Sequence, residues 1–290
     1  MKNNFYRLKK TFCVLSLAYS FVLMLSGAED PKLPPNVRNF APGEFFPGHL
    51  QGIAADESGI YWSCYDRVLK TGWDGKILAS VRTPRHAGDC CLKDGKLYVS
   101  TTFYDRKEIV EAKGIRAALY IFDCGTLRLE KRVLLPDIPF PDGITWYGDE
   151  LYLADQSVNK EHFLNQFFIY DRDLKFQRRE VIEVGVPTRF GAQALSVWNG
   201  KLLACFYAKR GRPSSYLLEP GTLKVVGTFP LGGSIGLAAV PESVAGRPDV
   251  FCRGRLAGKV GAYYAQADFF FLENGKARPF PVQSLKVKKT

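Results

Sequence analysis

The chain has 290 residues, of which 46% are hydrophobic and 24% charged, and this length can bury a core without disulfide staples. The 40 Lys and Arg residues outnumber the 29 Asp and Glu residues, so the formal net charge is +11. The basic residues are scattered among acidic ones, without a basic stripe or a nucleic-acid-binding motif, so we do not expect nucleic acid as a partner. The positive balance suits an acidic sugar, an anionic polysaccharide or a membrane surface, or is an ordinary charge excess.

Residues 1–28 have the pattern of a secretory signal peptide. A basic segment precedes the apolar run TFCVLSLAYSFVLML, Thr11–Leu25, and the small residues Ser26 and Ala28 precede the expected cleavage site. The run is short for the roughly 20 residues that span a bilayer, so we expect cleavage rather than a membrane anchor. The mature chain would be residues 29–290, without a membrane span and in a periplasmic or secreted location.

The mature chain contains five segments of one repeating pattern. Each has a polar or glycine-containing start, an apolar strand, a tight polar turn and a second strand, and another strand pair follows. The equivalent start positions are Gly52, Asp89, Gly143, Ala194 and Gly236, which lie 37, 54, 51 and 42 residues apart. Four strands in about 40–50 residues is the period of a β-propeller blade.

Strand and turn chemistry predict the fold class. Runs such as KLYVS and ELYLA mix apolar, aromatic and β-branched residues, and Asp-Gly, Asn-Gly and Gly-Asp turns separate them. We therefore predict an all-β chain that forms a single β-propeller over residues 29–290, most simply with five four-stranded blades. A sixth blade would need strands from residues 36–46 and the tail. A β-sandwich is the alternative, but it does not explain a repeated four-strand unit.

The repeat predicts which side chains share one end of the propeller. Equivalent apolar residues, Ile60, Leu97, Leu151 and Leu202, should occupy equivalent places in four successive blades. His49 and His86 occupy the same slot of the first two repeats, so they should lie side by side, and at least one imidazole should be neutral near pH 7 because two imidazolium ions repel. The long connections between the second and third strands, residues 102–116, 156–166, 209–215 and 253–267, should lie at the same end, where loops commonly carry function.

The candidate site is the ring of polar residues at these strand starts. We expect three catalytic residues, His49, His86 and Asp142, and the same three as ligands of one divalent cation. We expect the substrate to be bound by Gln51, Asp89, Gln193, Arg85 and Arg189. Imidazole and carboxylate ligands suit Zn²⁺ or Mn²⁺, whereas carboxylate and amide oxygens suit Ca²⁺. The alternative is that these side chains are structural pegs that satisfy backbone amides around the axis.

One blade also resembles a known family. The segment PFPDGITWYGDELYLADQSVN, Pro139–Asn159, is similar to the blade signature of SMP-30/gluconolactonase-like and NHL-type propellers. The resemblance implies a propeller fold, and in the lactonase-like members the Asp that matches Asp142 is a metal ligand and the proposed base. Those enzymes have six blades and a Glu where this chain has Gln51.

Three function classes follow from the sequence. The first is a hydrolase or lyase that acts on a sugar, a sugar lactone or a glycan fragment at the channel mouth. The second is a non-catalytic module that binds a glycan or a protein, and the third is a periplasmic scaffold. An enzyme should bring His49, His86 and Asp142 together, whereas a binding module should show an aromatic surface. Candidates for that surface are Phe103, Tyr104, Phe163 and Tyr207.

Overall fold

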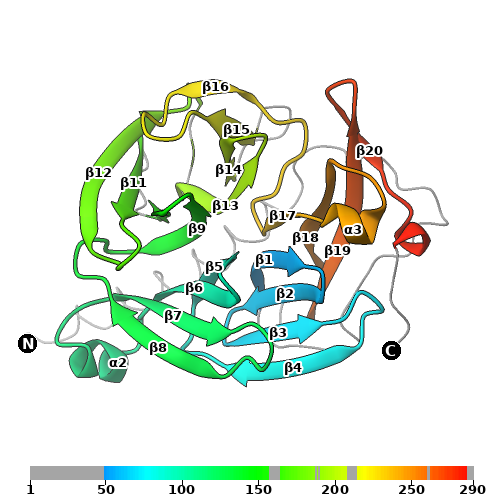
Figure 1. Ribbon diagram of the computed structural model, residues 1–290. Coiled ribbons are helices and arrows are strands. Elements are labelled where there is room, and N and C mark those ends of the chain that lie inside the picture. The colour runs from blue at the N-terminus through cyan, green and yellow to red at the C-terminus, as the bar shows by residue number, and fades with distance from the viewer. Residues whose placement is uncertain are drawn as a thin grey trace, which may run out of the picture.

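Five four-stranded antiparallel sheets surround a common axis (Figure 1). The computed structural model describes residues 49–156, 164–186, 188, 190–207, 214–259 and 262–285. Both the all-β class and the five-blade count predicted from the repeat are confirmed, and strand order within every sheet equals chain order from the axis outward. The predicted signal peptide, residues 1–28, lies outside the described residues.

The strands of each blade are as follows. Blade 1 contains β1 (Leu50–Asp56), β2 (Gly59–Cys64), β3 (Arg67–Thr71) and β4 (Ile77–Arg82), and blade 2 contains β5 (Ala87–Lys93), β6 (Lys96–Thr102), β7 (Ala117–Asp123) and β8 (Leu129–Leu134). Blade 3 contains β9 (Pro141–Tyr147), β10 (Glu150–Asp155), β11 (Leu164–Tyr170) and β12 (Phe176–Glu183). Blade 4 contains β13 (Ala192–Trp198), β14 (Lys201–Phe206), β15 (Ser215–Leu218) and β16 (Val225–Thr228), and blade 5 contains β17 (Leu237–Ala239), β18 (Val250–Lys259), β19 (Ala262–Glu273) and β20 (Lys276–Pro279).

Within the described residues, the helices are short. α2 (Arg106–Glu111) and α3 (Glu242–Ala245) lie between strands, and the 3-10 turn η1 (Val282–Ser284) follows the last strand. Among the described residues, no helix is long and apolar enough to cross a membrane. The long loop predicted at residues 253–267 is wrong, because β18 and β19 pair without a break from Val250↔Phe271 to Lys259↔Ala262. Pairing satisfies the backbone groups of this projecting hairpin, which a bare loop would leave to water.

The tight turns follow the chemistry of their residues. Asp94 and Gly95 both have positive φ, at 49° and 71°, and Asn199 and Gly200 repeat this geometry at 46° and 69°. Two successive positive φ values characterise the type I′ hairpin turn, which favours Asn-Gly and Asp-Gly. These turns join the first and second strands of blades 2 and 4, and they lie at the end of the propeller opposite to the strand starts.

The hydrophobic core is divided among the five blade interfaces. Each of the five apolar clusters combines side chains of two adjacent blades, and the fifth interface joins blade 5 to blade 1. Alternation along β2 explains this division, because Ile60 and Trp62 pack toward blade 5 while Tyr61, between them, packs toward blade 2. A second strand buried on both faces reads as a continuous apolar run.

The equivalence of the four second strands is also confirmed. Leu97, Leu151 and Leu202 each pack against the preceding blade, as Ile60 does, and all four are fully buried. All six described cysteines are free thiols, and five of them are buried.

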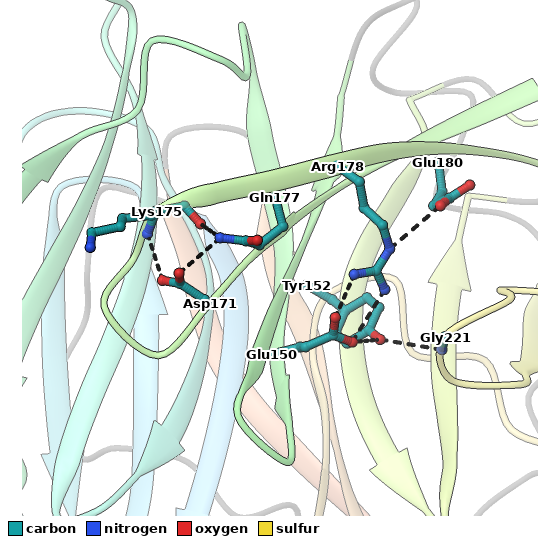
Figure 2. A network of polar contacts seen from close by, with 8 residues as sticks. All are labelled: Glu150, Tyr152, Asp171, Lys175, Gln177, Arg178, Glu180 and Gly221. Atoms are coloured by element: carbon teal, nitrogen blue, oxygen red, sulfur yellow. Dashed lines mark hydrogen bonds and ion pairs between the residues drawn. The ribbon is translucent and has the colours of Figure 1, made fainter.

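Hydrogen bonds of polar side chains join neighbouring blades at the end of the propeller where the tight turns lie. The Tyr152 hydroxyl of blade 3 donates to Glu150 Oε2 at 2.5 Å and accepts from the Gly221 N–H of blade 4 at 3.3 Å (Figure 2). Two nitrogens of Arg178 bind the two Glu150 oxygens, and this partner lowers the pKa of the Glu150 carboxyl. The Tyr61 hydroxyl likewise connects blade 1 to blade 2, because it donates to the Cys124 carbonyl at 3.0 Å.

The innermost strands approach one another so closely that glycine is required. A Cβ built on Gly52 would lie 2.5 Å from the Cα of Asp89, and one built on Gly143 would lie 2.8 Å from the Ala192 carbonyl oxygen. Such separations are well inside van der Waals contact with backbone atoms of the next blade. The recurring glycine at the repeat start is therefore a consequence of crowding at the axis.

Gly52→Ala should destabilise the fold by about 2 kcal/mol, because the added methyl group must displace backbone of blade 2. Gly227→Ala is the matched control. Gly227 lies on the outer strand β16, and a Cβ built on it would meet only Leu217 Cδ1, at 3.9 Å. The control should be neutral or slightly stabilising. Urea denaturation of the two variants checks this, and equal effects would contradict the crowding argument.

Candidate functional site

The two histidines lie at the strand-start end, here called the histidine face, on either side of one tyrosine. The ring centroid of Tyr65 is 5.5 Å from that of His49 and 5.8 Å from that of His86. Backbone hydrogen bonds fix this arrangement, since the Tyr65 N–H donates to the His49 carbonyl at 2.9 Å and the Tyr65 carbonyl accepts from the His86 N–H at 2.6 Å. The repeat thus brings the histidines together, as predicted.

Burial favours the neutral form of both imidazoles. Burial, followed by the charge of His49, lowers the pKa of His86 to about 4. Burial also lowers the pKa of His49, although a hydrogen bond with the Gln51 side chain opposes this shift. A neutral imidazole has one donor and one acceptor nitrogen, so each ring can serve a ligand hydroxyl in either sense.

His86 differs from a structural peg in its unsatisfied side chain. Its Nδ1 is buried and has no hydrogen-bond partner within the described part of the chain. Its backbone φ is +69°, a region that non-glycine residues rarely adopt. A peg would use its nitrogen to satisfy a backbone group, and buried polar atoms without partners call for an explanation.

Aromatic side chains continue from His86 across the histidine face. The Tyr104 ring lies 4.8 Å from the His86 ring and 6.4 Å from Phe140, measured between centroids. Tyr104 is 49% exposed although it is a large aromatic residue. We call the continuous set of ring contacts the aromatic row; its members are His49, Tyr65, His86, Tyr104 and Phe140.

Asp142 lies behind this row rather than on its surface. Its side chain is buried, and Gln156 Nε2 donates to its Oδ2 at 3.1 Å. Burial raises the pKa of the Asp142 carboxyl, whereas hydrogen bonds from the Asp89 backbone and the Gln193 side chain lower it. The Tyr104 hydroxyl donates to Gln156 Oε1 at 3.4 Å. Asp142 is therefore linked to the aromatic row through Gln156.

Asp89 lies near the axis, where its carboxyl group accepts hydrogen bonds from two other blades and contacts a third. Its Oδ2 accepts the Leu195 N–H of blade 4 at 2.9 Å and the Ile144 N–H of blade 3 at 3.3 Å. Its Oδ1 lies directly against Gly52 of blade 1. Complete burial raises the pKa of this carboxyl, and the backbone amides partly offset the shift. This is the arrangement expected of a peg.

The other predicted substrate-binding residues are placed differently. Gln51 and Gln193 are buried; Gln193 Nε2 donates to the Phe190 carbonyl at 2.8 Å. Arg85 is exposed beside His86, and Arg189 lies outside the described residues. Among the expected surface aromatics, Phe103 is buried in the core, Tyr104 is exposed, Tyr207 is half-buried and Phe163 is not described.

The sequence reasoning missed Tyr65 and Gln156, although the repeat contains a signal for both. Each follows directly on the last residue of a second strand, after Cys64 and Asp155 respectively. Tyr207 follows β14 in the same way. Second strands end at the histidine face, so the residues that follow them form a second ring beside the strand starts.

The predicted cation ligands do not form a metal-binding set. Within the described residues, no group of three or more His, Cys, Asp or Glu side chains is placed to hold a metal ion. Asp142 is engaged by two glutamines and a backbone amide, and His49 by Gln51. These three residues therefore do not form a site that fits the predicted divalent cation. The cation remains a prediction from the sequence.

Similarity to known proteins is confined to solved structures of low sequence identity. No family model and no curated protein matches the sequence. The structure is similar to the Pan2 WD40 domain of Neurospora crassa, with a TM-score of 0.43 and 10% identity over 81% of this chain and 67% of that one. It is also similar to a protein of unknown function from Bacteroides caccae (TM-score 0.37, 14% identity, 62% and 81% covered) and to BamB from Moraxella catarrhalis (0.37, 10%, 79% and 60%). The geometry itself defines a five-bladed β-propeller with a polar, aromatic histidine face.

Raising the pH above 4 should favour Asp89→Asn over the unsubstituted chain. A carboxyl whose pKa is raised by folding stabilises the folded state below the unfolded pKa of about 3.9, and this contribution is lost as the pH rises through the folded pKa. The Asn variant keeps an acceptor oxygen but does not titrate. Denaturation between pH 4 and 8 measures the difference.

Asp123→Asn is the control with the opposite sign. Hydrogen bonds from Thr126 lower the pKa of the Asp123 carboxyl, so its contribution is present above the unfolded pKa and is lost as the pH falls. A difference between Asp89→Asn and the unsubstituted chain that does not change with pH would show that Asp89 keeps its normal pKa in the fold.

Proposed function

We propose that this chain is an exported propeller that binds a carbohydrate or a sugar lactone on the aromatic row. The observation that carries the proposal is the ring contact between His86 and Tyr104, in which Tyr104 is 49% exposed at the histidine face. Export rests on the predicted signal peptide of residues 1–28.

The chemistry of the aromatic row suits a sugar. Ring faces pack against the C–H faces of a pyranose, while sugar hydroxyls need both donors and acceptors. The imidazoles and the Tyr104 hydroxyl are the polar groups of the row, although one His49 nitrogen already binds Gln51. Ligand sites commonly combine aromatic walls with a few fixed polar groups. The hydrogen bond from Tyr104 to Gln156, which in turn holds Asp142, orients one wall of this site.

The same groups favour binding over acid–base catalysis. A general base is most effective when its pKa lies near the working pH, and the His86 pKa of about 4 is far below it. Asp142 is 1% exposed, so its carboxyl does not reach a ligand on the surface of the row. We therefore assign Asp142 a positioning role through Gln156.

Hydrolysis or lyase chemistry is the second candidate. One observation favours it: the environment lowers the pKa of the His86 imidazole and raises that of the Asp142 carboxyl. Divergent pKa values in neighbouring groups are the pattern of an acid–base pair. Turnover of a lactone or glycoside that survives in Tyr104→Ala but is abolished in His86→Gln would establish this candidate over simple binding.

Saccharide binding tests the proposal directly. Mono- and disaccharides and aldonolactones are titrated calorimetrically against the mature chain, in EDTA so that binding does not depend on a metal. Tyr104→Ala and His86→Gln should each weaken binding about tenfold, the effect of losing about 1.4 kcal/mol. The matched control is Phe176→Ala, which removes a 39% exposed aromatic ring from the outer strand β12.

The control should leave the affinity nearly unchanged, although it removes ring contacts with Phe168 and Tyr170. Absence of binding to every saccharide and lactone would overturn the proposal. Binding that is insensitive to both Tyr104→Ala and His86→Gln would place the ligand elsewhere and would also overturn it. A loss of stability in His86→Gln without loss of binding would show that His86 is a peg.

A further inference from the structure

We infer that the ligand of the aromatic row is acidic, a sugar with a carboxylate such as a uronic acid, and that Arg116 recognises the carboxylate with Arg85 as the second cation. This inference rests on the proposed function and deepens it by naming the ligand class. Arg116 was not among the residues that the sequence marked as part of the site.

The backbone places Arg116 beside the exposed ring of the aromatic row. The Phe103 N–H donates to the Arg116 carbonyl at 2.6 Å, which closes the base of the connection containing α2 and sets Arg116 across from the residue before Tyr104. Arg116 is itself exposed. Burial raises the pKa of the Tyr104 hydroxyl, and the positive charge of Arg116 opposes this shift, as expected of a guanidinium near that ring.

Arg85 approaches the same ring pair from the other side. It directly precedes His86 in the connection from β4 to β5, and it is exposed. Because the His86 and Tyr104 rings are 4.8 Å apart, the backbone of two separate connections brings an arginine near this ring contact. Both are fixed by backbone next to a residue of the proposed site.

The acidic groups near these arginines leave them unpaired. In the part of the chain that the structure describes, neither Arg85 nor Arg116 forms an ion pair. Glu108 lies near Arg85, yet its Oε2 is buried without a partner, and burial raises the pKa of the Glu108 carboxyl. Asp142 is hydrogen-bonded internally. Neither guanidinium is therefore engaged in an ion pair, although the Glu108 carboxyl lies near Arg85.

A carboxylate is the group that this arrangement fits best. The planar guanidinium presents paired donors that match the two oxygens of a carboxylate, and such charge-assisted bonds are stronger than neutral ones. A uronic acid joins this group to a pyranose ring, so one molecule can occupy both the aromatic row and the arginines. The mature chain expected after cleavage, residues 29–290, keeps a formal net charge of +7, which also favours the approach of anions.

The test compares each acidic sugar with its neutral counterpart, glucuronate with glucose and galacturonate with galactose, by calorimetric titration at low and at physiological salt. The unsubstituted chain should prefer the uronates by about tenfold or more, and added salt should reduce this preference. Arg116→Gln should remove most of the preference while leaving the affinity for the neutral sugar unchanged, and Arg85→Gln should reduce it by a smaller factor.

Arg128→Gln is the matched control. Arg128 is also exposed and basic, but it lies in the turn before β8, at the opposite end of blade 2. It should keep the full preference, and melting temperatures of all three variants establish that they fold. Equal affinity for acidic and neutral sugars would overturn the inference and leave the proposed function standing. A uronate preference that survives Arg116→Gln and Arg85→Gln would overturn the assigned residues, and absence of any saccharide binding would overturn both proposals.

Discussion

The close approach of five inner strands at the axis is the constraint on which the rest of the molecule depends. With only five blades, backbone of one blade reaches the Cα atoms of the next, and side chains larger than hydrogen do not fit at Gly52 or Gly143. The carboxylate of Asp89 fills the remaining space and binds amides of two blades. The polar groups that face solvent lie at the strand ends, on the histidine face. A ligand can therefore be bound there without an open channel along the axis.

This crowding separates two sets of polar residues that look alike in the sequence. Asp89, with Ser63 and Ser100, satisfies backbone groups between blades: the serine hydroxyls donate to the carbonyls of Gly88 and Asp142, each at 2.5 Å. His86 directly precedes β5, the strand that contains Asp89, and its buried Nδ1 has no hydrogen-bond partner within the described residues. A peg and a candidate ligand-binding residue are therefore three positions apart in the chain, and their hydrogen bonds distinguish them.

The fold could be predicted because the repeat encodes local rules, whereas the site could be predicted only in part. Turn residues such as Asn199 and Gly200 and the equivalent apolar residues of the second strands depend on their own blade and its neighbour. Pairing of His49 with His86 follows from the same register. The contacts of Asp89 arise between blades up to 106 residues apart, and periodicity carries no information about which carboxylate meets which amide. The paired arm of β18 and β19 was missed because its glycines and arginines resemble a loop.

The division of the core among blade interfaces has a consequence for how the ring is held shut. Within the described residues, every β-ladder lies inside one blade, and each blade is built from four consecutive strands. Among the described strands, none of the first blade pairs with one of the last blade. The two blades meet through the apolar cluster that contains Trp62, Trp73 and Phe269. The seam is chemically of the same kind as the other four interfaces but has no covalent connection across it. All five blades are therefore held to their neighbours by apolar packing of the same kind. A circularly permuted chain that begins at another blade would preserve every β-ladder.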